Sequence, residues 1–151
     1  MMSPAGFDHG RFAWRVGVAL DRFAVPRGLG ELVSAETGFL IARNPDTVRA
    51  PDVAFVRADR VPPGGVKGFF PGPPDIAVEV VSPGDRPSEV LAKVRDWQRA
   101  GAPLVWVVDP ETRTVTAYRS PSEIVVLSAA DTLVGGDVLA GFSLPVADIF
   151  A

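Results

Sequence analysis

Glu79 is the residue whose setting in this sequence most favours chemistry. It lies in the segment DIAVEVV (75–81), where alternating side chains predict a strand with Glu79 and Asp75 on one face. A carboxylate flanked by valines in mid-strand is expected to be partly buried, and an isolated buried carboxylate requires a cation, a metal ion or a shared proton. Glu79 is therefore a candidate catalytic or metal-binding residue. The alternative is a structural ion pair with one of the 13 arginines.

Asp52 and Lys93 are the two other residues suited to chemistry. Asp52 begins a short apolar strand, DVAFV (52–56), and strand edges commonly carry sites; the alternative is a strand-entry residue that bonds backbone amides after Pro51. Lys93 falls at the margin of the apolar stripe of a helix predicted over 88–100, so it can reach back over the preceding strand. The alternative is a packed stem with its ammonium group in water.

Two carboxylates and a lysine that meet near the end of a strand could support metal-assisted hydrolysis. Carboxylate oxygens are ligands that Mg²⁺ accepts. The ion activates water and offsets charge on a phosphodiester, while the lysine orients the water or stabilises the developing charge. This chemistry needs neither histidine nor cysteine.

The composition excludes several other kinds of site. The 151 residues include no cysteine, which excludes disulfides, thiol nucleophiles and cysteine-bound metals. The single histidine, His9, excludes multi-histidine metal sites, and a Ser–His–Asp triad would have to use it. A net charge of −3 excludes a strongly basic DNA-coating protein but not a local basic patch.

The hydrophobic pattern predicts the elements that would position these residues. Helices are expected over 8–23, with Asp8 as its N-cap, and from Pro87 to about residue 100. The continuously apolar run LVWVV (104–108) predicts an interior strand covered on both faces. Further strands are expected over 32–41, with an irregularity around 35–38, and over 52–56, 75–81, 114–119 and 124–127, with a short element over 146–150.

The order of these elements predicts an α/β or α+β fold, a mixed β-sheet flanked by helices, in one domain over 1–151. The helix after Pro87 would be the crossover between two parallel strands. The segment 61–75 holds five prolines and four glycines and predicts a long irregular loop. Its Lys67, Phe69 and Phe70 could contact nucleic acid, or the phenylalanines could pack on the core.

A specific order of motifs runs along nearly the whole chain: Pro-Asp, then Glu-x-Val-Ser-Pro, then a helical lysine, then Trp-Val-Val-Asp-Pro. As a set, this order resembles the Uma-type restriction endonuclease family of the PD-(D/E)XK nuclease superfamily. The segments that carry the resemblance are RAPDVAFV (49–56), PDIAVEVVSPGDRPSEVLAKVRDW (74–97), AGAPLVWVVDPETRTVTAYR (100–119) and GFSLPVADIF (141–150), and MSPAGFDHG (2–10) is also similar to a family segment.

The resemblance implies a restriction-endonuclease-like fold, often as a homodimer, and assigns roles to individual residues. Asp52 matches the motif aspartate and Glu79 the motif glutamate, so both are implied as ligands of Mg²⁺ or Mn²⁺, with the backbone carbonyl of Val80 as a third. The superfamily's usual lysine would stand at Val81, and Lys93 resembles the lysine that has moved to the following helix.

Two further points come from the resemblance. Glu36, in SAETGF, matches a recurrent family position and is implied as an auxiliary ligand; the alternative is a strand residue paired with an arginine. Family members usually carry an earlier strand–turn segment with a Tyr-Glu-Leu-type acidic motif. This sequence begins with MMSPAG and is expected to lack that segment, which bears on activity more than on fold.

The residues and the resemblance together predict a Mg-dependent DNA endonuclease that hydrolyses phosphodiester bonds with metal-activated water. One alternative is a catalytically impaired member of the same fold that binds nucleic acid or protein; another is a nuclease acting on RNA or single strands. No apolar run approaches the ~18–20 residues that span a bilayer, and no secretory signal is visible. We therefore expect a cytoplasmic protein whose partner is nucleic acid rather than a membrane.

Overall fold

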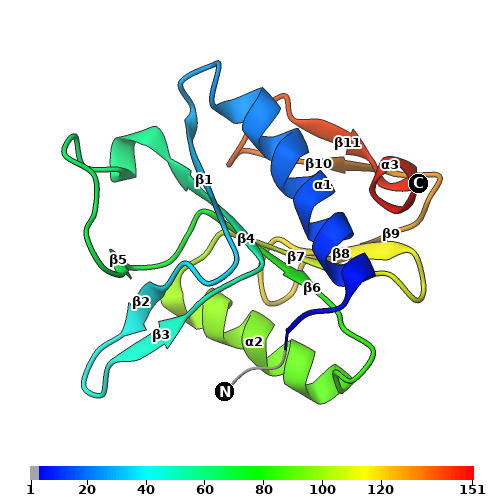
Figure 1. Cartoon of the computed structure of the whole chain (residues 1–151), viewed down its shortest axis with the longest axis horizontal. Helices are drawn as coiled ribbons and strands as arrows, with labels where there is room; N and C mark the ends of the chain where they lie inside the picture. The colour runs from blue at the N-terminus through cyan, green and yellow to red at the C-terminus, as the bar shows by residue number, and fades with distance from the viewer. Residues whose placement is uncertain (1–3) are drawn as a thin grey trace.

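A mixed six-stranded sheet forms the centre of the computed structural model, which describes residues 4–151 (Figure 1). Residues 2 and 3 of the family-like segment 2–10 lie outside the described residues. The strand order is β1-β4-β6-β7-β8-β9. The bounds are Gly30–Ser34 (β1), Val53–Arg57 (β4), Ile76–Val80 (β6), Leu104–Asp109 (β7), Thr114–Tyr118 (β8) and Ile124–Leu127 (β9).

Strands β6 and β7 are the parallel pair of this sheet, joined by helix α2 (Pro87–Ala100). The other neighbouring strands, from β1 to β6 and from β7 to β9, pair antiparallel. The sheet is therefore mixed, and the predicted fold class is confirmed, as is the predicted crossover helix. Pro87 lies in the first turn of α2, and Gly101 ends the helix with φ 101°, a left-handed conformation that glycine adopts without strain.

Helices cover the two faces of the sheet. Helix α1 (Phe7–Ala24) and the short α3 (Val146–Phe150) pack on one face, and α2 packs on the other. Strand β7 contributes side chains to the hydrophobic cores on both faces of the sheet. Trp106 packs on the α1 side, whereas Val105 and Val107 pack on the α2 side. This confirms the prediction that LVWVV is covered on both faces. By the same alternation, Ala77 belongs to the α2 side and Val78 to the α1 side.

The segment expected as one strand over 32–41 forms two strands in different sheets. The chain leaves β1 at Ser34 and turns through Glu36, whose φ of 70° is incompatible with a continuous strand. It then enters a three-stranded sheet of order β3-β2-β5, with β2 at Phe39–Ala42, β3 at Thr47–Arg49 and β5 at Phe70–Pro71. A separate two-stranded sheet pairs β10 (Thr132–Val134) with β11 (Ser143–Pro145).

The predicted loop 61–75 is therefore tied down near its end. The backbone amides of Phe70 and Gly72 donate to the carbonyls of Gly38 and Leu40, which forms β5 beside β2. Phe70 packs on Phe39, with ring centroids 5.6 Å apart, whereas Phe69 is 61% exposed. Packing on the core thus holds for Phe70 and not for Phe69.

Helix α1 begins one residue earlier than predicted, and its N-cap is Gly6. The prediction of Asp8 as N-cap is wrong, because Asp8 lies within the first turn and its carboxylate pairs with Arg11 at 2.8 Å. Across residues 4–151, none of the helices combines the length and apolar composition that a bilayer crossing requires.

Candidate metal and active site

The candidate site lies where β6 extends beyond the first residue of β4. Strand β4 begins at Val53, which pairs with Val78, so the last two residues of β6 have no β4 partner. Asp52 fills this gap: its amide donates to the carbonyl of Val78 (3.0 Å), and its Oδ2 accepts from the amide of Val80 (2.7 Å). The backbone thereby holds the Asp52 side chain beside the end of β6.

Glu79 lies on the α2 face of β6, with only 8% of the residue exposed. Its Oε2 accepts a hydrogen bond from the indole Nε1 of Trp97, at 2.9 Å. Asp52 precedes β4 at this same end of the sheet, and its charge acts on the Glu79 carboxyl. The two predicted carboxylates therefore lie near each other at one end of neighbouring strands.

Burial raises the pKa of Glu79 to about 7. The Trp97 hydrogen bond opposes that rise, the charges of Asp52 and Asp85 add to it, and the Lys93 ammonium lowers it. Electrostatics therefore connect all three residues expected from the sequence, because Asp52 and Lys93 both act on Glu79. At neutral pH the Glu79 carboxyl is poised between its protonated and ionised forms.

Neither carboxylate is neutralised by a guanidinium. Within residues 4–151, Asp52 and Glu79 form no ion pair with an arginine. Asp75 does, since its Oδ2 accepts from Nη1 of Arg60 (3.0 Å) and from the Arg57 amide (2.8 Å). The structural ion pair considered for Glu79 is thus found instead at Asp75, the residue that directly precedes β6.

His9 reaches the site from the first turn of α1. Its Nε2 lies 3.2 Å from Oδ2 of Asp52, and the two side chains are 13% and 20% exposed. The helix that covers one face of the sheet therefore contributes a ring nitrogen to a carboxylate at the sheet's end. The sequence marked His9 only as the single histidine and gave no sign of this contact.

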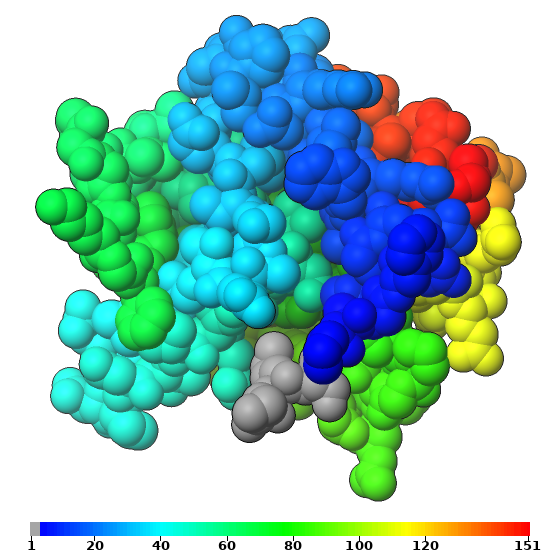
Figure 2. All heavy atoms as spheres, viewed as in Figure 1, coloured from blue at the N-terminus to red at the C-terminus, as the bar shows by residue number. Residues whose placement is uncertain are grey.

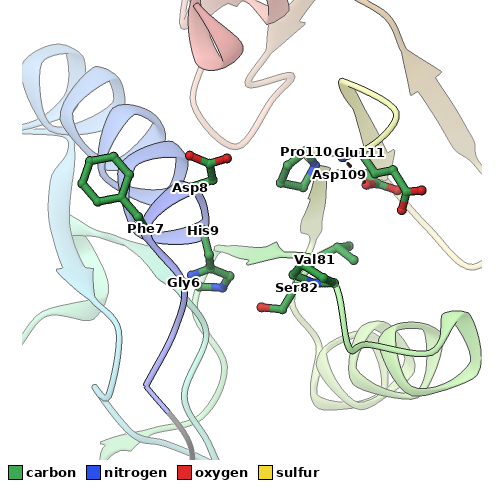
Figure 3. Close-up of a pocket in the computed structure, with 10 residues that line it drawn as sticks. Gly6, Phe7, Asp8, His9, Val81, Ser82, Asp109, Pro110 and Glu111 are labelled. Atoms are coloured by element: carbon green, nitrogen blue, oxygen red, sulfur yellow. Dashed lines mark hydrogen bonds between the residues drawn. The ribbon is translucent and has the colours of Figure 1, made fainter.

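A cleft of about 800 Å³ lies beside His9, the residue that contacts Asp52 (Figure 3). The first turn of α1 forms one side, and the other side is formed by the residues that follow β6, the last residue of β7 and the turn after it. In Figure 2 the start of α1, in dark blue, lies beside the light green segment that joins β6 to α2. Asp52, Glu79 and Lys93 do not line the cleft; it meets the site through His9 and Val81.

The other residues expected at the site are more exposed. Lys93 lies on the surface of α2, and Val81, where the superfamily's usual lysine would stand, is a half-buried apolar side chain. Glu36 is exposed in the turn after β1. Because Ser34 pairs with Val53, that turn lies at the same end of the sheet as Asp52.

The Val80 carbonyl faces the same strand edge as Asp52. The N–H and C=O of one strand residue point to the same side, and the Val80 N–H donates to Asp52. Strand β4 does not extend far enough to pair with this carbonyl. A backbone oxygen is thus available next to the two acids.

Three nearby residues were not recognised as site residues from the sequence: His9, Trp97 and Asp85. Trp97 follows Lys93 by four residues and therefore lies on the same helix face, a signal that could have been read. Asp85 accepts a hydrogen bond from the Ser82 amide (2.9 Å) in the turn after β6. Its proximity to Glu79 depends on how that turn folds back, which residue spacing does not reveal.

The residues fit a magnesium ion better than a zinc ion. Among residues 4–151 there is no cluster of three or more His, Cys, Asp or Glu side chains suited to hold a metal. Structural and catalytic zinc sites need three or four such ligands, whereas Mg²⁺ is commonly held by one or two carboxylates plus water and substrate phosphates. The hydrogen bonds of Asp52 and Glu79 engage Oδ2 and Oε2, which leaves Oδ1 and Oε1 for an ion.

The model of the Uma2 family, described as "Putative restriction endonuclease", matches residues 1–147 of the chain. The chain belongs to this family. The Uma-type resemblance drawn from the sequence motifs is thus confirmed, and membership in Uma2 supports a nuclease in general.

Among solved structures, the fold is similar to the crystal structure of a nuclease, described as putative, of the DUF820 family from Anabaena variabilis. The TM-score is 0.84 at 21% sequence identity, over 99% of this chain and 83% of the other. At that identity the similarity shows a shared fold alone. No curated protein matches the chain.

Proposed function

We propose that this chain is a divalent-metal-dependent endonuclease that hydrolyses phosphodiester bonds of DNA. The observation that carries the proposal is the meeting of Asp52 and Glu79 at the open end of β6, where neither has an arginine partner among residues 4–151. A buried carboxylate next to a second carboxylate is costly unless a cation joins them, because each charge raises the free energy of the other. Family membership supports the reaction class.

In this proposal Oδ1 of Asp52, Oε1 of Glu79 and the Val80 carbonyl hold one Mg²⁺ or Mn²⁺ ion. When bound, the ion supplies Lewis-acid stabilisation of the phosphodiester and activation of the attacking water. The protein keeps both carboxylates oriented through hydrogen bonds to their other oxygens, from the Val80 amide and from Trp97. Glu36, in the turn at the same end of the sheet, is a proposed auxiliary ligand.

Lys93 provides the positive charge in the proposed reaction. It lies on α2 one turn before Trp97, and its charge already acts on Glu79. An ammonium group there can orient the attacking water or stabilise the negative charge that develops on the phosphoryl oxygens. Its exposure leaves it free to meet an incoming phosphate.

DNA is expected to approach over α2 rather than through the cleft. Asp8, Asp109 and Glu111 line the cleft, and no lysine or arginine does, so a phosphate backbone is repelled there. Helix α2 instead carries Lys93, Arg95 and Arg99.

A homodimer, implied by the family resemblance, remains a prediction that sedimentation of the purified chain would test.

Cleavage of supercoiled plasmid with Mg²⁺ or Mn²⁺ tests the proposal. The wild-type chain should nick or cut the plasmid, and Glu79→Gln should abolish cleavage without unfolding the protein. Glu111→Gln, an acid across the cleft from α1, is the matched control and should cut normally. Cleavage that survives in Glu79→Gln would reject the assignment, and DNA retardation without any cleavage would favour the binding-module alternative.

A further inference from the structure

The hydrogen bond between Trp97 and Glu79 crosses between two elements that face each other across the core. Nε1 of Trp97, on α2, donates to Oε2 of Glu79, on β6, at 2.9 Å, and both residues are more than nine-tenths buried. An indole N–H is a donor only, so it can bond a carboxylate oxygen but can never compete for a cation. It holds one oxygen of Glu79 and leaves the other free.

The Trp97 ring is itself fixed by aromatic packing. It meets the ring of Phe39, on β2, in an edge-to-face contact with centroids 6.2 Å apart and planes at 83°. Phe39 packs in turn on Phe70 of β5. The three-stranded sheet therefore clamps the ring that carries the donor, and the direction of the N–H is set by packing rather than by the carboxylate.

From these contacts we infer that Trp97 is the positioning residue of the site, which selects the carboxylate orientation in which Oε1 of Glu79 faces the divalent ion. This inference rests on the proposed role of Glu79 as a ligand. Trp97 touches neither the ion nor the substrate in this proposal, and it acts only through Glu79. Partners of this kind commonly change metal affinity by 10–100-fold when they are removed.

The chain offers a matched control in Trp106. Trp106 is also fully buried, but its Nε1 has no hydrogen-bond partner among the described residues. Trp97→Phe and Trp106→Phe thus delete the same atoms from equally buried rings. Only the first deletes a donor to Glu79, so a difference between the variants reports the hydrogen bond and not the loss of ring volume.

Mn²⁺ affinity, measured by calorimetry or by the free-ion electron paramagnetic resonance signal, tests the inference without any cleavage assay. Trp97→Phe should weaken Mn²⁺ binding by about tenfold, whereas Trp106→Phe should stay within about twofold of wild type. Glu79→Gln should remove high-affinity Mn²⁺ binding from the wild-type chain and from both tryptophan variants. Equal Mn²⁺ affinity in the two tryptophan variants would overturn the inference.

A spectroscopic measurement covers the case in which Trp97→Phe does not fold. In Trp106→Phe, the remaining tryptophans are Trp97 and the 70% exposed Trp14. Mg²⁺ binding to Glu79 should shift the emission of the buried indole bonded to it, and Glu79→Gln should abolish the shift. Unchanged emission at a Mg²⁺ concentration that calorimetry shows to be saturating would overturn the inference.

Different results would reject the proposed function and the positioning role of Trp97. If wild-type protein binds no Mn²⁺, or binds it equally well in Glu79→Gln, the proposed function fails and the positioning role fails with it. If binding depends on Glu79 but not on Trp97, only the positioning role fails.

Discussion

Nε2 of His9 lies 3.2 Å from Oδ2 of Asp52, although the two residues belong to different elements and are 43 positions apart in the sequence. The contact joins the first turn of α1 to the residue that precedes β4. The Val80 amide bonds the same oxygen, so His9 and the backbone both engage Oδ2 and leave Oδ1 free. The histidine is therefore placed to orient Asp52, a proposed metal ligand.

His9→Ala is expected to weaken Mn²⁺ binding and plasmid cleavage by about tenfold, because Asp52 loses a side-chain partner that restricts its orientation. Asp8→Asn is the matched control. Asp8 is the adjacent residue in the same turn, but its carboxylate pairs with Arg11. Calorimetric titration with Mn²⁺ measures the effect, and an unchanged affinity in His9→Ala would show that the contact is incidental.

Stability should depend on pH through Glu79. Its pKa is raised to about 7 in the folded state from 4.5, so the folded protein holds a proton that the unfolded chain releases. The stabilisation that the bound proton gives the folded state is complete below 4.5, the pKa of Glu79 in the unfolded chain, and it is lost as pH rises through about 7. The difference of roughly 2.5 pKa units corresponds to about 3 kcal/mol.

Glu79→Gln removes this titration, so the metal-free variant should gain stability over wild type as pH rises from about 5 to 8, by up to about 3 kcal/mol. Urea unfolding in the presence of a chelator at the two pH values measures the difference. At pH 8, added Mg²⁺ should raise the stability of the wild-type protein again, whereas it should leave the stability of the variant unchanged. If the stability of both proteins changes with pH in the same way, burial does not raise the pKa of Glu79 in the folded state.

Lys93→Gln should lower kcat for cleavage by about 100-fold without weakening Mn²⁺ binding, because it removes a positive charge aimed at the phosphoryl group and not a ligand. Arg22→Gln serves as the control, since Arg22 lies in the last turn of α1, the helix that covers the other face of the sheet. Single-turnover cleavage and Mn²⁺ titration separate the two effects. A Lys93 variant with normal kcat would assign the lysine to the solvated surface.

Arg60→Met should destabilise the fold without changing metal affinity. Arg60 bonds Oδ2 of the buried Asp75 and the carbonyl of Pro73 at 2.7 Å, so its loss leaves a buried carboxylate with only the Arg57 amide. We expect a loss of about 2 kcal/mol, allowing for the partial exposure of the arginine. Chemical denaturation measures this, and a change in Mn²⁺ affinity would show that the two acid sites are coupled.

The sequence by itself determined the sheet's central strands, both long helices and the candidate acids. Uninterrupted apolar runs and helical spacing report burial directly, and LVWVV and the helix from Pro87 formed as expected. Glu79 could be found because a charge among valines is a local anomaly. The irregularity expected around residues 35–38 is found, but its extent was not predicted, because neither glycine nor proline occupies position 36, where the positive φ divides the segment into two strands.

Only the tertiary structure decided which groups surround the acids. His9 meets Asp52 because the first turn of α1 reaches the start of β4, and Trp97 meets Glu79 because α2 packs over β6. Asp75 and Glu79 look alike in the strand pattern, yet one is bound by Arg60 and the other by an indole. Residue spacing encodes faces of single elements, whereas contacts between elements depend on chain packing, and those contacts separate a structural acid from a candidate ligand.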